Sequence, residues 1–77
     1  MDIKQLGKEL NKMYFKAPKG EVVAMIHLFG IKYAKDIKAS KFSKKAIAEE
    51  AGIPVSFAVE INKGVKLAHY VDIKPKF

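Results

Sequence analysis

The stretch that decides the fold is residues 44–63, KKAIAEEAGIPVSFAVEINK. It predicts two helices joined by a tight turn at Gly52, because a residue in the left-handed conformation just after a helix is usually glycine. Two closely crossing helices need a small residue on the inner face of the first, and Ala48 provides one. Ile53 is expected to fill the turn from inside.

The ends of this unit carry their own signals. Ser43 is a good N-cap for the first helix. In the second helix, Ala58 and Ile61 are expected to face back onto the first. Lys63 and Gly64, a cation in the last turn and a stop residue, predict the end of the second helix.

The run from Ile47 to Ile61 carries the pattern A-x-x-x-G-I followed by apolar residues in the second helix. It resembles the helix-turn-helix of bacterial transcription repressors, including the lac repressor type, over about 20 of the 77 residues. To a lesser degree, the whole chain resembles small helix-turn-helix modules found beside bacterial restriction enzymes. The resemblance implies a bacterial protein whose partner is double-stranded DNA. A purely structural helical hairpin is the alternative.

Length, charge and cysteine content limit the possible partners and location of the protein. A chain of 77 residues is expected to form one domain, residues 1–77. Fifteen cations against eight acids give a net charge of +7, which favours nucleic acid first and an anionic membrane surface second. All the cations are lysines, so the usual bidentate reader of guanine, arginine, is missing. The absence of cysteine fits a reducing cytoplasm, where we expect the protein to act.

Outside the central unit, apolar periodicity predicts further helices. Residues 2–16 are expected to form an amphipathic helix with one stripe of apolar side chains. Residues 21–30 are apolar nearly all round, which predicts a core helix or one shared between two subunits; a buried strand is the competing interpretation. Gly30 is either a kink in a longer helix or the break between two. The stripe of residues 2–16 consists of Ile3, Leu6, Leu10 and Met13.

The C-terminal segment is ambiguous, since residues 65–73 alternate like a strand and also fit a helix through about Tyr70. The predicted fold is therefore all-α. We expect a small bundle of four to five helices that contains the helix-turn-helix, with a short C-terminal strand as the open alternative. The longest strongly apolar run, Val22 to Ile31, is far too short to span a bilayer. A membrane-surface role is disfavoured by the missing tryptophan and by the lack of a basic helix with a large exposed apolar face, so no membrane partner is expected.

The expected DNA-binding residues are of two kinds. Lysines beside the motif suit contacts to phosphate, and residues on the outer side of the second helix suit base edges and thymine methyl groups. The set is Lys41, Lys44, Lys45, Val55, Ser56, Val59, Glu60, Lys63 and Lys66.

The sequence contains no strong signal for a function other than binding. We find no catalytic constellation, no metal-ligand spacing and no cofactor motif, so a non-catalytic protein with none of these groups is expected. His27 is interpreted as a satisfied core histidine. The runner-up function is a protein-interaction module that uses the apolar face of Pro54, Val55 and Val59. A homodimer and a larger assembly both stay open.

Overall fold

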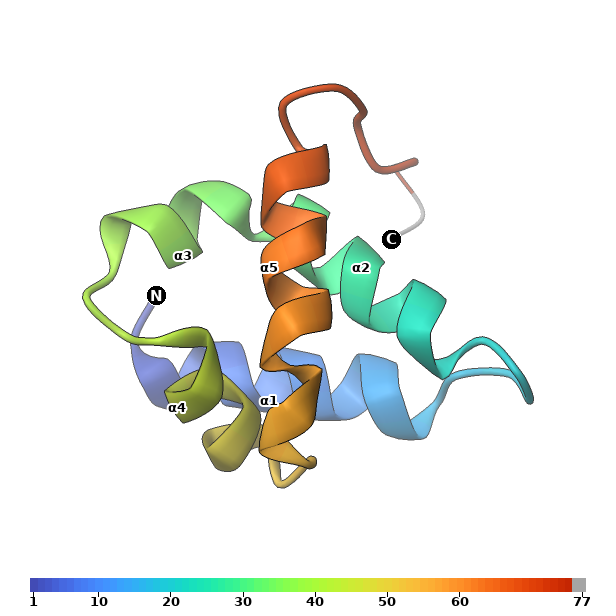
Figure 1. The fold of residues 1–77 in the computed structure, drawn as a ribbon, viewed down its shortest axis with the longest axis horizontal. Helices are drawn as coiled ribbons and strands as arrows, with labels where there is room; N and C mark the ends of the chain where they lie inside the picture. The colour runs from blue at the N-terminus through green and yellow to red at the C-terminus, as the bar shows by residue number, and fades with distance from the viewer. Residues whose placement is uncertain (76–77) are drawn as a thin grey trace.

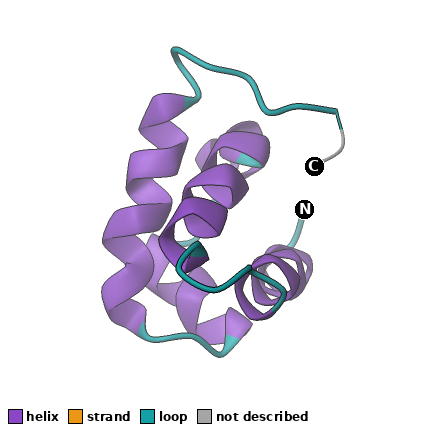
Figure 2. Ribbon diagram, turned by 90° about the vertical axis from the view of Figure 1, so that its right-hand side faces the viewer, coloured by secondary structure: helices purple, strands orange, loops and turns teal. Residues whose placement is uncertain are grey.

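A computed structural model describes residues 1–75, and those residues form helices, turns and loops without any strand (Figures 1 and 2). The prediction of an all-α bundle is confirmed. No helix in the described part of the chain has the length and apolarity needed to cross a membrane. The elements in chain order are α1 (Ile3–Phe15), α2 (Val22–Lys32), α3 (Ala34–Ala39), α4 (Lys44–Ala51), the 3-10 helix η1 (Val55–Phe57) and α5 (Ala58–Leu67).

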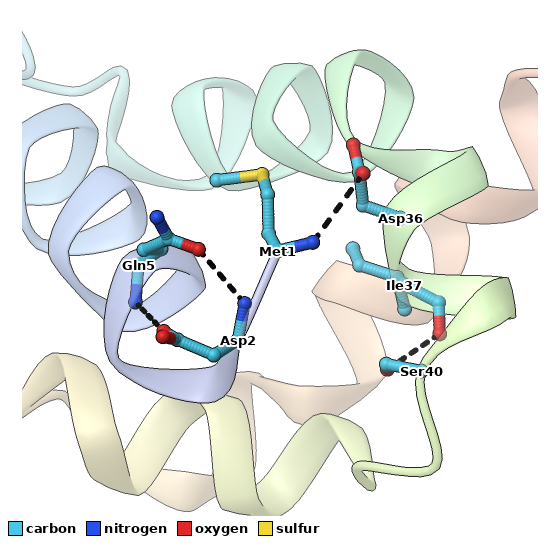
Figure 3. Close-up of polar contacts among 6 residues, drawn as sticks. All are labelled: Met1, Asp2, Gln5, Asp36, Ile37 and Ser40. Carbon is cyan, nitrogen blue, oxygen red and sulfur yellow. Dashed lines mark hydrogen bonds and ion pairs between the residues drawn. The ribbon is translucent and has the colours of Figure 1, made fainter.

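Local hydrogen bonds fix the N-terminal end of the bundle. The backbone N–H of Gln5 donates to Asp2 Oδ1 at 2.8 Å, and the backbone N–H of Asp2 donates to Gln5 Oε1 at 2.9 Å. This reciprocal capping box explains why α1 begins at Ile3 (Figure 3). The amino group of Met1 lies 3.8 Å from Asp36 in α3. That contact ties the chain start to a helix more than thirty residues away.

The core collects apolar side chains from every α-helix. From α1, Leu6 and Leu10 are fully buried, while Ile3 and Met13 at the edges of the same stripe are half-buried. The amphipathic helix predicted for residues 2–16 is thus confirmed. The buried core comprises Leu6, Leu10, Ile26, Phe29, Ala34, Ile37, Ile47, Ala48, Ala51, Ile53, Ile61 and Val65.

Two glycines set the closest helix crossing. Gly30 of α2 and Gly64 of α5 are both buried and face each other. A Cβ built on Gly30 would lie 2.6 Å from the carbonyl oxygen of Ile61 and 2.8 Å from the Cα of Gly64. The two backbones are therefore in direct contact, and α5 lies across α2 in Figure 1.

This crossing corrects two sequence-based predictions. Gly64 does not stop the second helix, because α5 continues to Leu67. Gly30 is neither a kink nor a break, because it lies inside α2, and the chain changes direction at Tyr33. In both cases glycine serves close approach between helices rather than a local change in backbone conformation.

Two open alternatives between helix and strand are also decided. Residues 21–30 form a helix, not a strand, although Val23 is 42% exposed, so this helix is not buried all round. After α5 the chain makes a turn over residues 68–70 and then runs on without regular structure through residue 75. The helical alternative for the C-terminal segment is confirmed, and its strand alternative is wrong.

Candidate nucleic-acid interface

The turn between α4 and η1 has the geometry that the sequence predicts. Gly52 is left-handed, with φ +75° and ψ +26°. Its N–H donates to the carbonyl of Glu49 at 3.0 Å, and the N–H of Ile53 donates to the carbonyl of Ala48 at 3.1 Å. These two bonds form a Schellman motif. Because the side chain of Ile53 is only 5% exposed, the turn is anchored in the core.

The start of α4 concentrates positive charge. The hydroxyl of Ser43 accepts from the backbone N–H of Ala46 at 3.0 Å, which confirms Ser43 as the N-cap. Lys44 and Lys45 occupy the first turn, and no acidic residue accompanies them there. Cations near a helix N-terminus meet the positive end of the helix dipole, at a cost of about 0.3–1 kcal/mol each when exposed. The arrangement disfavours the helix slightly and favours an anion.

The second helix of the motif is held from its inner side. It begins as the 3-10 turn η1, in which the N–H of Phe57 donates to the carbonyl of Pro54 at 3.1 Å. The ring of Phe57 packs edge-on against Tyr14 of α1 at 5.7 Å between centroids. Farther along, Ile61 is fully buried and Val65 is 4% exposed. η1 and α5 are thus fixed against the rest of the bundle.

The outer side of the same segment faces solvent. Val55 is 45% exposed, Val59 is 59% exposed and Ser56 is exposed. Lys63 and Lys66 are exposed on the later turns of α5. Positions 56, 59, 63 and 66 are three or four residues apart, so they share one face of the helix. We call the exposed residues Val55, Ser56, Val59, Lys63 and Lys66 the outer face.

A helix, a glycine turn and a second helix with a solvent-facing outer side are the parts of a helix-turn-helix. A model of the HTH-like domain family matches residues 2–74. The chain belongs to the HTH-like domain family. The comparison with curated proteins gave no match, and neither did the comparison with solved structures. Membership of this family indicates a DNA-binding module in general.

Glu60 occupies a particular place in this HTH-like domain. Its Oε1 lies 2.7 Å from His27 Nε2, and its Oε2 lies 3.4 Å from Lys63 Nζ. A carboxylate only accepts hydrogen bonds, so the imidazole of His27 donates. This hydrogen bond, followed by the interaction with Lys63, holds the pKa of Glu60 below its usual value. Both oxygens are engaged, and the side chain is only 21% exposed.

The Glu60 contacts have two consequences for the site. They link α5 to α2 beside the glycine crossing, and they partly neutralise Lys63. His27 is hydrogen-bonded as predicted, but it is half-buried rather than deep in the core, with 28% of its side chain exposed. The sequence contained no signal for the pairing itself, because 33 residues separate the partners.

The predicted lysines fall into two groups. Lys41, in the loop before α4, and Lys45, in its first turn, are exposed, and Lys44 in the first turn is half-buried. Lys63 and Lys66 belong to the outer face of α5.

Within residues 1–75, no cluster of three or more His, Cys, Asp or Glu side chains could hold a metal ion.

Proposed function

We propose that residues 1–77 act as a single helix-turn-helix domain that docks non-catalytically on double-stranded DNA through the outer face. In this proposal η1 and the first turns of α5 enter the major groove. The supporting observation is the exposed stripe of the outer face on a helix whose opposite side is fixed by the Schellman turn and by the Gly30–Gly64 crossing. We propose that the protein acts in the bacterial cytoplasm, where it would meet DNA.

Lysines supply most of the affinity in this proposal. Lys41, Lys44 and Lys45 at the start of α4 contact one stretch of phosphates, where the helix dipole adds to their charge. Lys63 and Lys66 contact phosphates from α5, and Lys63 contributes less because Glu60 shares its charge.

Base reading is modest. Ser56 can hydrogen-bond a base edge or a phosphate, and Val55 and Val59 can contact thymine methyl groups. Glu60 could accept from cytosine N4 only by giving up part of its bonds to His27 and Lys63. With no arginine in the chain, we propose a weak sequence preference for one copy. A homodimer or a larger assembly would supply further contacts.

The test is a titration of labelled random-sequence duplex DNA at several salt concentrations. Each neutralised phosphate adds about −0.9 to the slope of log affinity against log salt. Four fully effective lysines and a partly neutralised Lys63 therefore predict a slope of about −4. No binding at low salt would refute the proposal.

A matched pair of variants locates the contact. Lys44→Glu with Lys45→Glu should weaken binding to all sequences alike and reduce the steepness of the slope by about 2. Lys4→Glu with Lys8→Glu makes the same change of charge on α1, outside the proposed set of contact residues, and should affect binding far less. Equal losses from the two pairs would mean that only net charge matters.

The second candidate function is a protein-interaction module. The observation that favours it is the exposure of Val55 and Val59 beside Pro54, which together form an apolar face on the outer side of the motif. Such a face suits a partner helix, with the lysines serving solubility. Val59→Asp separates the two functions. If the domain is a protein-interaction module, Val59→Asp should abolish binding to the protein partner. Lys44→Glu with Lys45→Glu should then leave that binding unchanged.

A further inference from the structure

A small groove lies between the later turns of α1 and the helix α2. Its apolar floor is formed by Met13, Met25 and Tyr33, all half-buried, and its volume is about 230 Å³. Sites for small molecules and cofactors usually measure about 300–1,000 Å³. The groove is therefore suited to one or two apolar side chains of a larger partner rather than to a whole cofactor.

The rim of this groove is basic. Lys12 and Lys16 stand on the α1 side and Lys32 on the α2 side, and Glu9 is the acidic residue that lines it. Glu9 is engaged by Lys12, with 3.5 Å between its Oε1 and the lysine Nζ. The net charge around the floor is +2, from three lysines and one carboxylate.

The groove is separate from the outer face of the helix-turn-helix. Each residue turns a helix by about 100°, so Lys32 lies about 200° round α2 from Gly30, which contacts α5. Met25, five residues before Gly30, falls on nearly the same side as Lys32 by the same count. The groove therefore opens on the side of α2 that faces away from α5.

We propose that this groove binds a short acidic segment of a partner protein, with one or two apolar side chains inserted between Met13, Met25 and Tyr33. Methionine side chains are flexible and polarisable, and they adapt to apolar partners of different shape. Lys12 and Lys16, on the α1 side of the rim, would pair with carboxylates beside the anchor residue. Nucleic acid is a poorer fit, because its backbone offers charge without an aliphatic anchor for the floor.

Because the groove opens on the side of α2 that faces away from α5, and α5 carries most of the outer face, the proposed segment and DNA could be bound together. The domain would then serve to bring an acidic partner to DNA. The groove itself does not depend on DNA binding, and so it can be tested without DNA.

The experiment measures fluorescence anisotropy of a labelled peptide of about four helical turns. Leucines occupy one helical face of the peptide, and glutamates occupy the remaining positions. A second peptide, with alanine in place of each leucine, keeps the charge and removes the anchors. The full-length protein should bind the leucine peptide at least about tenfold more tightly, a difference of about 1.4 kcal/mol. Equal binding of both peptides, or no binding of either, would overturn the proposal.

Charge reversal on one helix provides a matched control. Lys12→Glu with Lys16→Glu should weaken binding of the leucine peptide by about tenfold or more, because it reverses the α1 side of the rim. Lys4→Glu with Lys8→Glu, the same change earlier in α1 and outside the groove, should leave binding within about threefold. Equal losses would mean unspecific attraction and would overturn the proposal.

A measurement on the unaltered protein guards against variants that fail to fold. In a ¹H–¹³C NMR titration, the methyl groups of Met13 and Met25 should shift on addition of the leucine peptide. Shifts confined to Val55 and Val59 would assign the peptide to the outer face instead and would contradict the groove.

Discussion

Replacing Gly64 by alanine tests the helix crossing that holds α5 in place. A Cβ at this position would overlap the carbonyl oxygen of His27 and would lie 2.9 Å from the Cα of Gly30. Ordinary carbon–carbon contacts are about 3.5–4.0 Å. The atoms in the way belong to the backbone of α2, so no side-chain rotation relieves the overlap, and the two helices must separate.

The sign of the effect discriminates between explanations. In an uncrowded helix, Gly64→Ala would stabilise the protein by about 1 kcal/mol through helix propensity. Overpacking of a tight core costs about 1–3 kcal/mol and sometimes more, and a backbone clash belongs at the upper end. The net expectation is a loss of about 1–2 kcal/mol, against a total stability of about 4–12 kcal/mol for a domain of this size. Tm should fall by about 5–15 °C.

The assay is thermal and urea unfolding followed by circular dichroism. Gly30→Ala should behave similarly, and the double variant should lose less than the sum, because the first substitution has already separated the helices. Unchanged or increased stability of Gly64→Ala would refute the close crossing. Strict additivity of the two substitutions would refute their direct contact.

Further predictions concern the caps and charges of the motif. Ser43→Ala should cost about 1 kcal/mol in urea unfolding, because the N–H of Ala46 loses its acceptor. Lys44→Glu should raise stability by about 0.3–1 kcal/mol through the helix dipole while it weakens DNA binding in the anisotropy assay; a parallel loss of both would contradict our interpretation. The pKa of Glu60 lies below its usual 4.5, so the stability from its bond to His27 is present above that pH and is lost as pH falls through the lowered pKa. Glu60→Gln should flatten the decline of Tm below pH 4.5, and an unaltered decline would mean that other carboxylates cause it.

Local signals in the sequence were sufficient for both ends of the first motif helix, α4, but not for the end of the second. The cap at Ser43 and the left-handed Gly52 each act over a few residues, so a short pattern contains the whole physical cause. The stripe of α1 was predictable for the same reason, since helical periodicity determines which side can be buried.

Tertiary contacts were beyond the reach of local patterns. Glycine suits a helix end and a close helix crossing equally well, and only the position of Gly30 shows that Gly64 serves the second purpose. The pairing of Glu60 with His27 likewise joins helices that are distant in sequence. The groove between α1 and α2 depends on which helices become neighbours, so no pattern within residues 2–16 could have indicated it.

The central claim is that DNA contacts the outer face, and a backbone-amide NMR titration with a random-sequence duplex at low salt tests it most directly. The largest shifts should fall on residues 41–45 and on Ser56, Val59, Lys63 and Lys66. The amides of α1, including those of Lys4 and Lys8, should change little. Shifts concentrated on α1, or none at all, would contradict the account.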